Sequence, residues 1–170
     1  GDIMVNWLST PMILSANSGT IDESIDLNGD SIIDFVFQVT TGSINVYSAT
    51  ENLCVIYPFG PPGVGGPVEP LPEGFAIDAG SGDGPLDWFG NDQSALVGVW
   101  LWQEGGSYKS AGRFPGNRAY MGVAFDIAGA RHYGWVDISV SDSRPYGEVY
   151  GWAYETTPGR AITAGVVPEP

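Results

Sequence analysis

Short hydrophobic runs, separated by glycine, proline and asparagine, are the dominant pattern along the chain. Runs of this length that are rich in valine, isoleucine and aromatic residues are typical of β-strands. No segment repeats its apolar residues at the 3.6-residue period of an amphipathic helix. We therefore expect strands at residues 3–8, 11–15, 32–40, 43–49, 52–57, 75–79, 95–103, 119–127, 131–141, 146–155 and 161–164.

The segments between these runs are predicted to be loops. Residues 58–74 hold six prolines and five glycines, which excludes a helix or a central strand and predicts a long surface loop or irregular arm. Residues 80–85 and 103–112 are expected to be further loops. Many short strands with such turns favour an all-β fold, an antiparallel β-sandwich or jelly-roll-like domain with long Gly/Pro-rich loops, spanning residues 1–166.

Alternation within the strands predicts which side chains share a face of a sheet. Residues 119–127, 131–141 and 146–154 are expected to form a meander whose aliphatic face packs on the core. The predicted core face consists of Ala119, Met121, Val123, Phe125, Ile127, His132, Gly134, Val136, Ile138, Val140, Gly147, Val149, Gly151 and Ala153. The reverse face is then aromatic and consists of Tyr120, Tyr133, Trp135, Tyr150, Trp152 and Tyr154.

This aromatic face has three interpretations. A second sheet can cover it, it can stack on the flat faces of sugar rings, or it can be buried against another copy of the chain, because large exposed apolar patches usually mark an interface. The sequence leaves all three open.

Composition narrows the possible partners. The chain has 20 acidic and 6 basic residues and a net charge of −14, so it lacks the basic footprint of a nucleic-acid-binding protein. No run approaches the ~20 apolar residues needed to span a bilayer, and we expect no membrane span. The single cysteine, Cys54, lies in an apolar run and is expected to be a buried thiol.

The strongest chemical motif is an acidic turn that begins at Asp26. Calcium prefers six to eight oxygen ligands, and the spacing offers side chains with a backbone carbonyl between them. The candidate ligands are Asp26, Asn28, Asp30, the carbonyl of Ile32, and Asp34. The turn resembles the first nine positions of an EF-hand loop, but Phe37 stands at the twelfth position and Ser31 at the usual glycine. The alternative is an Asx-type turn whose acids face water.

Little in the sequence suggests catalysis. His132 is the only histidine, no G-x-S-x-G elbow is present, and no second histidine or paired cysteine accompanies it for zinc. We expect His132 to be a structural residue, no catalytic residues, and no cofactor other than Ca²⁺. A secreted hydrolase that uses a pair of carboxylates is the weakest alternative, because 20 acids will always place some pair at a suitable distance.

Four segments carry a resemblance to a known family. The chain ends in Val167, Pro168, Glu169 and Pro170, and three internal segments accompany this ending: SIDLNGDSIIDFVF (24–37), YMGVAFDIAGARHYGWVDISVS (120–141) and GEVYGWAYETTPGRAI (147–162). Together they resemble the PEP-CTERM proteins of bacteria, in which a Val-Pro-Glu-Pro box is the sorting signal that an exosortase recognises. Here the membrane helix and basic tail that follow the box in that family are missing.

The resemblance implies an export route, with the signal peptide removed, and a secreted or cell-surface location in a bacterium. Members of that family are associated with extracellular polysaccharide, extracellular matrix and biofilm formation. We therefore expect a non-enzymatic structural protein that self-associates into a fibre or matrix and is stabilised by calcium. A secreted carbohydrate-binding module for extracellular polysaccharide is the alternative. For self-association, residues 3–8, or less favourably residues 161–170, are expected to pack on the next copy.

Overall fold

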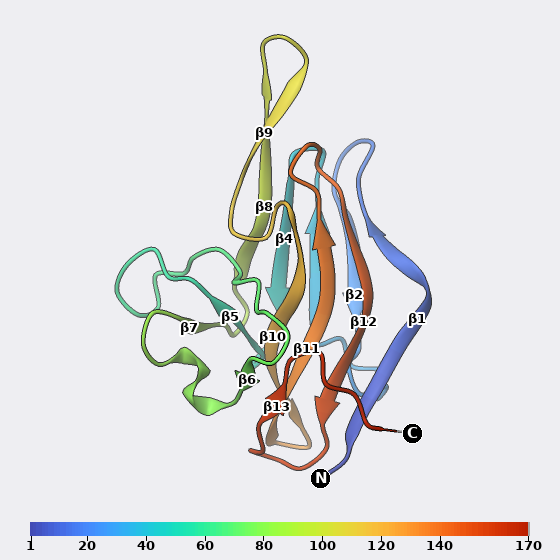
Figure 1. Ribbon diagram of the computed structural model, residues 1–170, viewed down its shortest axis with the longest axis vertical. Helices are drawn as coiled ribbons and strands as arrows, with labels where there is room; N and C mark the ends of the chain where they lie inside the picture. Colours follow the sequence, from blue (N-terminus) through green and yellow to red (C-terminus); the bar gives the residue numbers. More distant parts are fainter. Residues whose placement is uncertain (170) are drawn as a thin grey trace.

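The computed structural model describes residues 1–169 and confirms the all-β prediction (Figure 1). Its strands are antiparallel, and η1 (Ala79–Gly82) is a single short 3₁₀ turn. The strands are β1 (Ile3–Leu14), β2 (Ile21–Ile25), β3 (Phe35–Val39), β4 (Ser43–Ser48), β5 (Leu53–Ile56), β6 (Ala76–Ile77), β7 (Asp87–Gly90), β8 (Ser94–Gln103), β9 (Ser107–Ala111), β10 (Asn117–Ile127), β11 (Ala130–Val140), β12 (Gly147–Glu155) and β13 (Ile162–Thr163).

Two sheets pack face to face. The first, sheet A, has the strand order β1-β12-β11-β10-β5-β7, and the second, sheet B, has the order β2-β3-β4-β8-β9. The predicted meander of β10, β11 and β12 lies in the middle of sheet A. Both β1 at its start and the C-terminal segment after β13 lie at the end of the sandwich opposite the β8–β9 hairpin (Figure 1).

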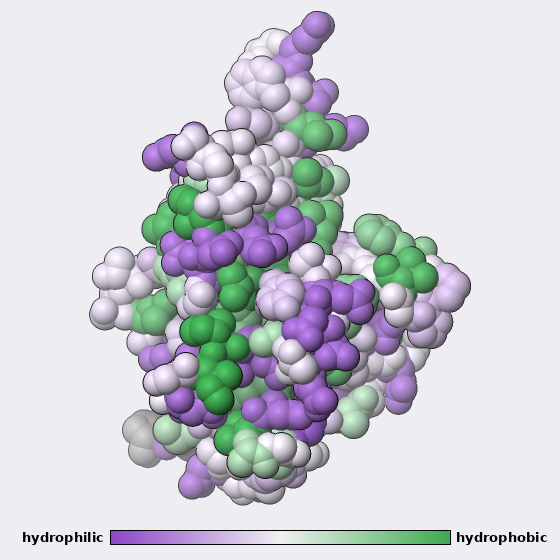
Figure 2. Space-filling view, turned by 180° about the vertical axis from the view of Figure 1, so that it is seen from behind, coloured by the Kyte–Doolittle hydropathy of each residue, from purple (hydrophilic) through white to green (hydrophobic). Residues whose placement is uncertain are grey.

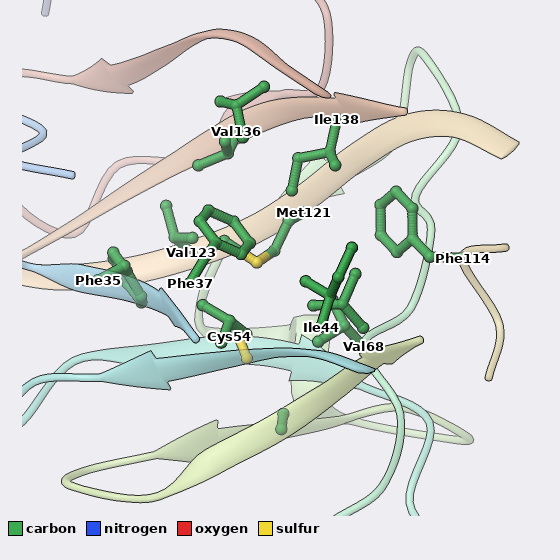
Figure 3. Packing of buried hydrophobic residues seen from close by; sticks show 14 of the residues in the cluster. Phe35, Phe37, Ile44, Cys54, Val68, Phe114, Met121, Val123, Val136 and Ile138 are labelled. Carbon is green, nitrogen blue, oxygen red and sulfur yellow. The ribbon is translucent and has the colours of Figure 1, made fainter. Parts of the chain in front are cut away.

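The core lies between the two sheets and follows the predicted alternation in most strands. Phe35, Phe37 and Ile44 of sheet B face side chains of sheet A such as Met121 and Val136 (Figure 3). All five are fully buried. Burial of this apolar surface stabilises the fold by roughly 25 cal/mol per Å² removed from water.

Cys54 is buried in this core as the sequence predicts. Burial raises the pKa of its thiol to about 12, so the thiol is protonated at neutral pH and packs as a small apolar group.

A third, smaller layer covers the outer face of sheet A. It contains the two-stranded pair β6–β13 together with residues 71–75. Trp135 lies beneath it and is fully buried, as are Ile77 and Leu71 on the covering side. The centre of the predicted aromatic face is therefore covered by another part of the same chain.

A bulge in β12 corrects part of the face prediction. Between the register pairs Asp137–Gly151 and Ile138–Val149, Tyr150 is an extra residue on β12. An extra residue reverses the side to which all following side chains point. Tyr150 therefore stays on the outer face, as predicted, whereas Trp152 and Tyr154 point into the core and Gly151 and Ala153 point outward, which is the reverse of the prediction.

The predictions for five strands were also wrong or incomplete. Residues 103–112, expected to be a loop, form the turn and second strand of the β8–β9 hairpin. Strands β2 and β7 were not predicted, because IDESI and DWFG carry acidic residues and lack a clear hydrophobic run. The runs 3–8 and 11–15 are one strand, β1, interrupted by a register shift between Trp7 and Met12. The run 32–40 begins as a strand only at Phe35.

The segment 58–74 forms no strand, in agreement with its proline content, but it is not entirely at the surface. Phe59 is exposed, whereas Val68 and Leu71 are fully buried and bond to the backbone of Leu96 and Tyr120. The segment is thus anchored to both sheets at its C-terminal half.

The N-terminal run forms the edge strand of sheet A in its own chain. Residues 3–7 pair with residues 151–155 of β12 on one side, and their packing on another copy stays a prediction. Ile162 and Thr163 likewise pair with β6 of the same chain. Of the four residues of the predicted sorting box, Pro170 lies outside the described residues.

Within residues 1–169, no helix has the length and apolar character required to cross a membrane.

Candidate functional site

A groove runs along the outer face of sheet A beside the third layer. It consists of two hollows, of about 270 and 460 Å³, that meet at Arg118. The first hollow lies against residues 71–73, and the second lies at the end of the sheet where β11 turns into β12. We call it the outer groove. The polar and aromatic side chains that line it are Glu73, Arg118, Tyr120, Asp137, Ser139, Tyr146, Glu148 and Tyr150.

Arg118 is held at the centre of the outer groove by two contacts. Its Nε and Nη2 atoms donate to the two carboxylate oxygens of Asp137, at 3.2 and 3.1 Å. Its guanidinium carbon lies 3.7 Å from the ring centroid of Tyr150, which is a cation–π distance. Asp137 is almost fully buried, whereas more than half of the Arg118 side chain is exposed. Two of the five N–H groups of the arginine are used, and three are left for a ligand or water.

The bulge in β12 delivers Tyr150 to this position. Its hydroxyl lies 2.8 Å from Ser139 Oγ on the neighbouring strand, which fixes the orientation of the ring. Both residues line the larger hollow. The irregularity that moves Trp152 into the core therefore also builds the centre of the groove.

A second tyrosine–arginine stack lies at the end of the groove. Arg144 stacks over the Tyr146 ring at 4.2 Å, and the Tyr146 hydroxyl donates to Glu148 Oε1 at 2.6 Å. This hydrogen bond lowers the pKa of Glu148 and keeps its carboxylate ionised at neutral pH. The groove thus combines aromatic rings, an arginine with unused N–H groups, and ionised carboxylates, which together suit a polyhydroxylated ligand.

The structure divides the predicted aromatic residues among three environments. Tyr120 and Tyr150 line the outer groove. Tyr133 and Trp135 are buried beneath the third layer, and Trp152 and Tyr154 pack on the core between the sheets. Sequence reasoning missed Arg118, Tyr146 and Glu148, although the outward position of Asp137 and Ser139 in the alternation of 131–141 pointed to this face.

The predicted calcium turn is closed by its own backbone. Asp26 accepts N–H groups of Gly29, Asp30 and Ser31 at 2.7 to 3.2 Å, and Asp30 accepts the N–H of Ile32 at 2.8 Å. These are the contacts of an Asx-type turn. Ile32 itself is exposed.

Asp34 anchors the other end of this turn. Its two carboxylate oxygens accept the N–H of Leu27 at 2.8 Å and the amide of Asn52 at 3.2 Å. Burial, together with the nearby charges of Asp26 and Asp30, raises the pKa of Asp34 to about 6. Asp34 therefore holds the turn in place through hydrogen bonds inside the protein.

The fit of this turn to calcium is partial. In residues 1–169, no group of three acidic, histidine or cysteine side chains lies close enough together to hold a metal ion. However, Asn28 Oδ1 is buried without a hydrogen-bond partner, and the carboxylates are close enough to disfavour each other's charge. A cation at the turn would draw on Asn28 Oδ1 and on the remaining lone pairs of Asp26 and Asp30.

His132 is buried in the core at the position that the alternation predicts. Its Nδ1 lies 2.9 Å from the carbonyl oxygen of Glu155, and its ring packs edge-on against Tyr154. These contacts give it a structural role within the described part of the chain.

Comparison with known proteins adds no relative: no protein-family model, no curated protein and no solved structure matches this chain. The resemblance to PEP-CTERM proteins, and the location and partners it implies, therefore stay predictions from the sequence motifs.

Proposed function

We propose that this protein is an exported, non-enzymatic module that binds extracellular polysaccharide through the outer groove. The observation that carries the proposal is the Arg118–Asp137–Tyr150 unit, in which a buried carboxylate and an aromatic ring hold a half-exposed guanidinium in place. A pre-oriented group of this kind binds a ligand with little loss of side-chain entropy. The three unused N–H donors of Arg118 suit sugar hydroxyls.

The proposed location outside the cell is supported by the sequence motifs alone. The resemblance to PEP-CTERM proteins supports export to the bacterial cell surface or extracellular matrix, with exosortase as a partner during export. The net charge of −14 supports a surface that stays soluble in that setting and does not bind nucleic acid. Calcium bound at the turn of residues 26–34 would stabilise the domain rather than take part in sugar binding, because this turn lies apart from the residues of the outer groove.

A binding experiment with two matched variants tests the proposal. Tyr150→Ala removes the ring beneath Arg118, whereas Tyr57→Ala removes the ring of the Arg113–Tyr57 stack, at 4.2 Å, which lies outside the groove. In affinity electrophoresis against a panel of bacterial polysaccharides, we expect Tyr150→Ala to weaken binding on the order of tenfold or more, as for a central contact. Tyr57→Ala should bind like the parent chain.

Two results contradict the proposal. Either no polysaccharide retards the parent chain, or both variants lose binding equally. A structural role in the extracellular matrix, through self-association, is the second candidate, and the projecting β8–β9 hairpin is the observation that favours it.

A further inference from the structure

We propose that copies of this chain join head to tail through the two free edges of sheet B, with β9 of one copy lying along β2 of the next. This inference is independent of the sugar site. It uses a different surface from the N-terminal run, which pairs with β12 in sheet A. Sheet B ends in β2 on one side and β9 on the other, and neither strand has a second neighbouring strand in the part of the chain that the structure describes.

The β8–β9 hairpin presents one of these edges away from the body of the molecule. It projects beyond the end of the sandwich (Figure 1), and Figure 2 shows a hydrophilic tip on this projection. Below the tip, the hairpin carries exposed Leu101 and Trp102, and Trp102 packs edge-on against Tyr108 at 4.8 Å. A two-stranded hairpin alone is marginally stable in water, so added contacts would stabilise it.

The charge on this edge differs from that of the rest of the protein. Of the six basic side chains, Arg113, Arg118, Arg131 and Arg160 pair with acids and Arg144 stacks on Tyr146. In residues 1–169, Lys109 has no ion-pair or aromatic partner. It is exposed on β9, opposite Leu101 of β8. Among the described residues, the one basic side chain with neither an ion pair nor an aromatic partner therefore lies on a free edge, in a chain with net charge −14.

The opposite edge of the same sheet is acidic. Strand β2 has the sequence IDESI, with exposed Asp22 and partly exposed Glu23. Asp22 pairs with Gln38, and its side chain points to the outer face of sheet B. Lys109 points to the same face, because its two neighbours in β9 point inward. These neighbours, Tyr108 and Ser110, pair with the inward-pointing Trp102 and Trp100. In a continued sheet, Lys109 and Asp22 of adjacent copies would share a face, while Tyr108 and exposed Ile21 would share the other.

The two edges could pair in three ways, β9 with β9, β2 with β2, or β9 with β2, and the charges favour the last of these. A charged side chain on an edge strand normally blocks further pairing. Two β9 edges would bring Lys109 beside Lys109, and two β2 edges would bring Asp22 and Glu23 beside their equals. Only β9 with β2 places opposite charges together, so the charges exclude like pairs and permit the unlike pair.

The geometry of the sheet makes this contact repeat. The five strands alternate in direction, so β2 and β9 run the same way, and successive copies in one orientation would pair these strands in parallel. A head-to-tail contact of this kind leaves one free edge at each end and produces a linear assembly unless the rotation closes a ring.

A charge-swap experiment tests the pairing. Sedimentation velocity is measured for the full chain, for Lys109→Glu, for Asp22→Lys and for an equal mixture of the two variants. We expect the full chain to associate and each variant alone to associate about tenfold more weakly, since attraction between exposed charges is replaced by repulsion. The mixture should regain association, because the glutamate introduced on β9 of one variant would face the lysine introduced on β2 of the other and restore an opposite-charge pair.

Glu104→Lys is the matched control. Glu104 lies in the turn between β8 and β9, outside both strands. Its replacement by lysine changes the net charge by the same amount as Asp22→Lys. It should associate at least as well as the full chain, and circular dichroism should show that every variant is folded. The proposal is overturned if the full chain is monomeric at high concentration and physiological salt, if Lys109→Glu associates normally, or if the mixture stays monomeric.

Discussion

The indole N–H of Trp152 donates to the backbone carbonyl of Leu27 at 3.2 Å. The N–H of the same Leu27 residue donates to Asp34 Oδ2 at 2.8 Å. Leu27 is therefore held on one side by a core residue of sheet A and on the other by a buried carboxylate. These two bonds tie the acidic turn of residues 26–34 to the centre of the sandwich, so the ionisation of this turn affects the stability of the whole domain.

The first prediction concerns the pH dependence of stability. Because the pKa of Asp34 is raised to about 6 in the folded protein, from 3.8, the folded state binds the proton more tightly than the unfolded state. The contribution of Asp34 should therefore increase the free energy of unfolding as the pH falls from 7 to 4, by at most about 3 kcal/mol. Urea unfolding in the presence of a chelator, at several pH values, measures it.

Asp34→Asn is the variant that isolates this group, because it is neutral at every pH. The difference in the free energy of unfolding between the parent chain and this variant should shift in favour of the parent chain on acidification. Parallel stability curves for the two chains between pH 7 and 4 would show that Asp34 titrates normally.

The second prediction concerns calcium at the same turn. If calcium binds the folded state alone, a concentration 100 times the dissociation constant stabilises it by about 2.7 kcal/mol. Chelation should then lower the melting temperature of the parent chain. Asp30→Ala should remove this response, whereas Asp22→Ala, an exposed acid on β2, should retain it. A melting temperature that is indifferent to chelator and to added calcium refutes the calcium proposal.

The third prediction concerns strand β1. Deletion of residues 1–8 removes the pairing with β12 and the Trp7 ring that packs 5.6 Å from Trp135. We expect a loss of unfolding free energy on the order of 3 kcal/mol or more, from lost hydrogen bonds and exposed apolar surface. Denaturant unfolding measures it, and a truncated chain of unchanged stability would contradict it.

A substitution tests the same strand pair without deletion. A Cβ atom at Gly151 would lie 2.5 Å from the Asn6 carbonyl oxygen and 2.7 Å from the Trp7 ring, so Gly151→Ala should separate β1 from β12. Gly60→Ala is the control, because a Cβ there meets no atom within 4 Å. Equal melting temperatures for the two variants would show that β1 adjusts without cost.

Local sequence pattern predicted the fold class because most strands here are hydrophobic runs bounded by turn residues. It located β10 and β11 with their core faces, since Met121, Val123 and Phe125 alternate without interruption. It did not predict β2 or the outer half of the hairpin, where acidic or polar residues are tolerated because each of these strands has a free edge.

Less of the candidate site than of the fold could be predicted from the sequence. The aromatic residues were recognised, but their faces depend on one extra residue in β12, which leaves no signal in the alternation of GEVYGWAYE. The pairing of Arg118 with Asp137 joins residues that are 19 positions apart and follows only from the register of β10 against β11. Coverage of Trp135 depends on residues 71–77 and 162–164, whose position no local pattern encodes.

The extra residue at Tyr150 also determines how this strand can vary in length. Removal of that one residue would join Val149 directly to Gly151, so the β11–β12 ladder would lose its register shift while Trp152 and Tyr154 keep their positions in the core. A single-codon deletion there would therefore leave the core residues of β12 in place and remove from the outer groove the ring that stacks with Arg118. A change of length elsewhere in β12 would reverse the faces of all the residues that follow, whereas at this one position the strand can lose a residue and change its outer face alone.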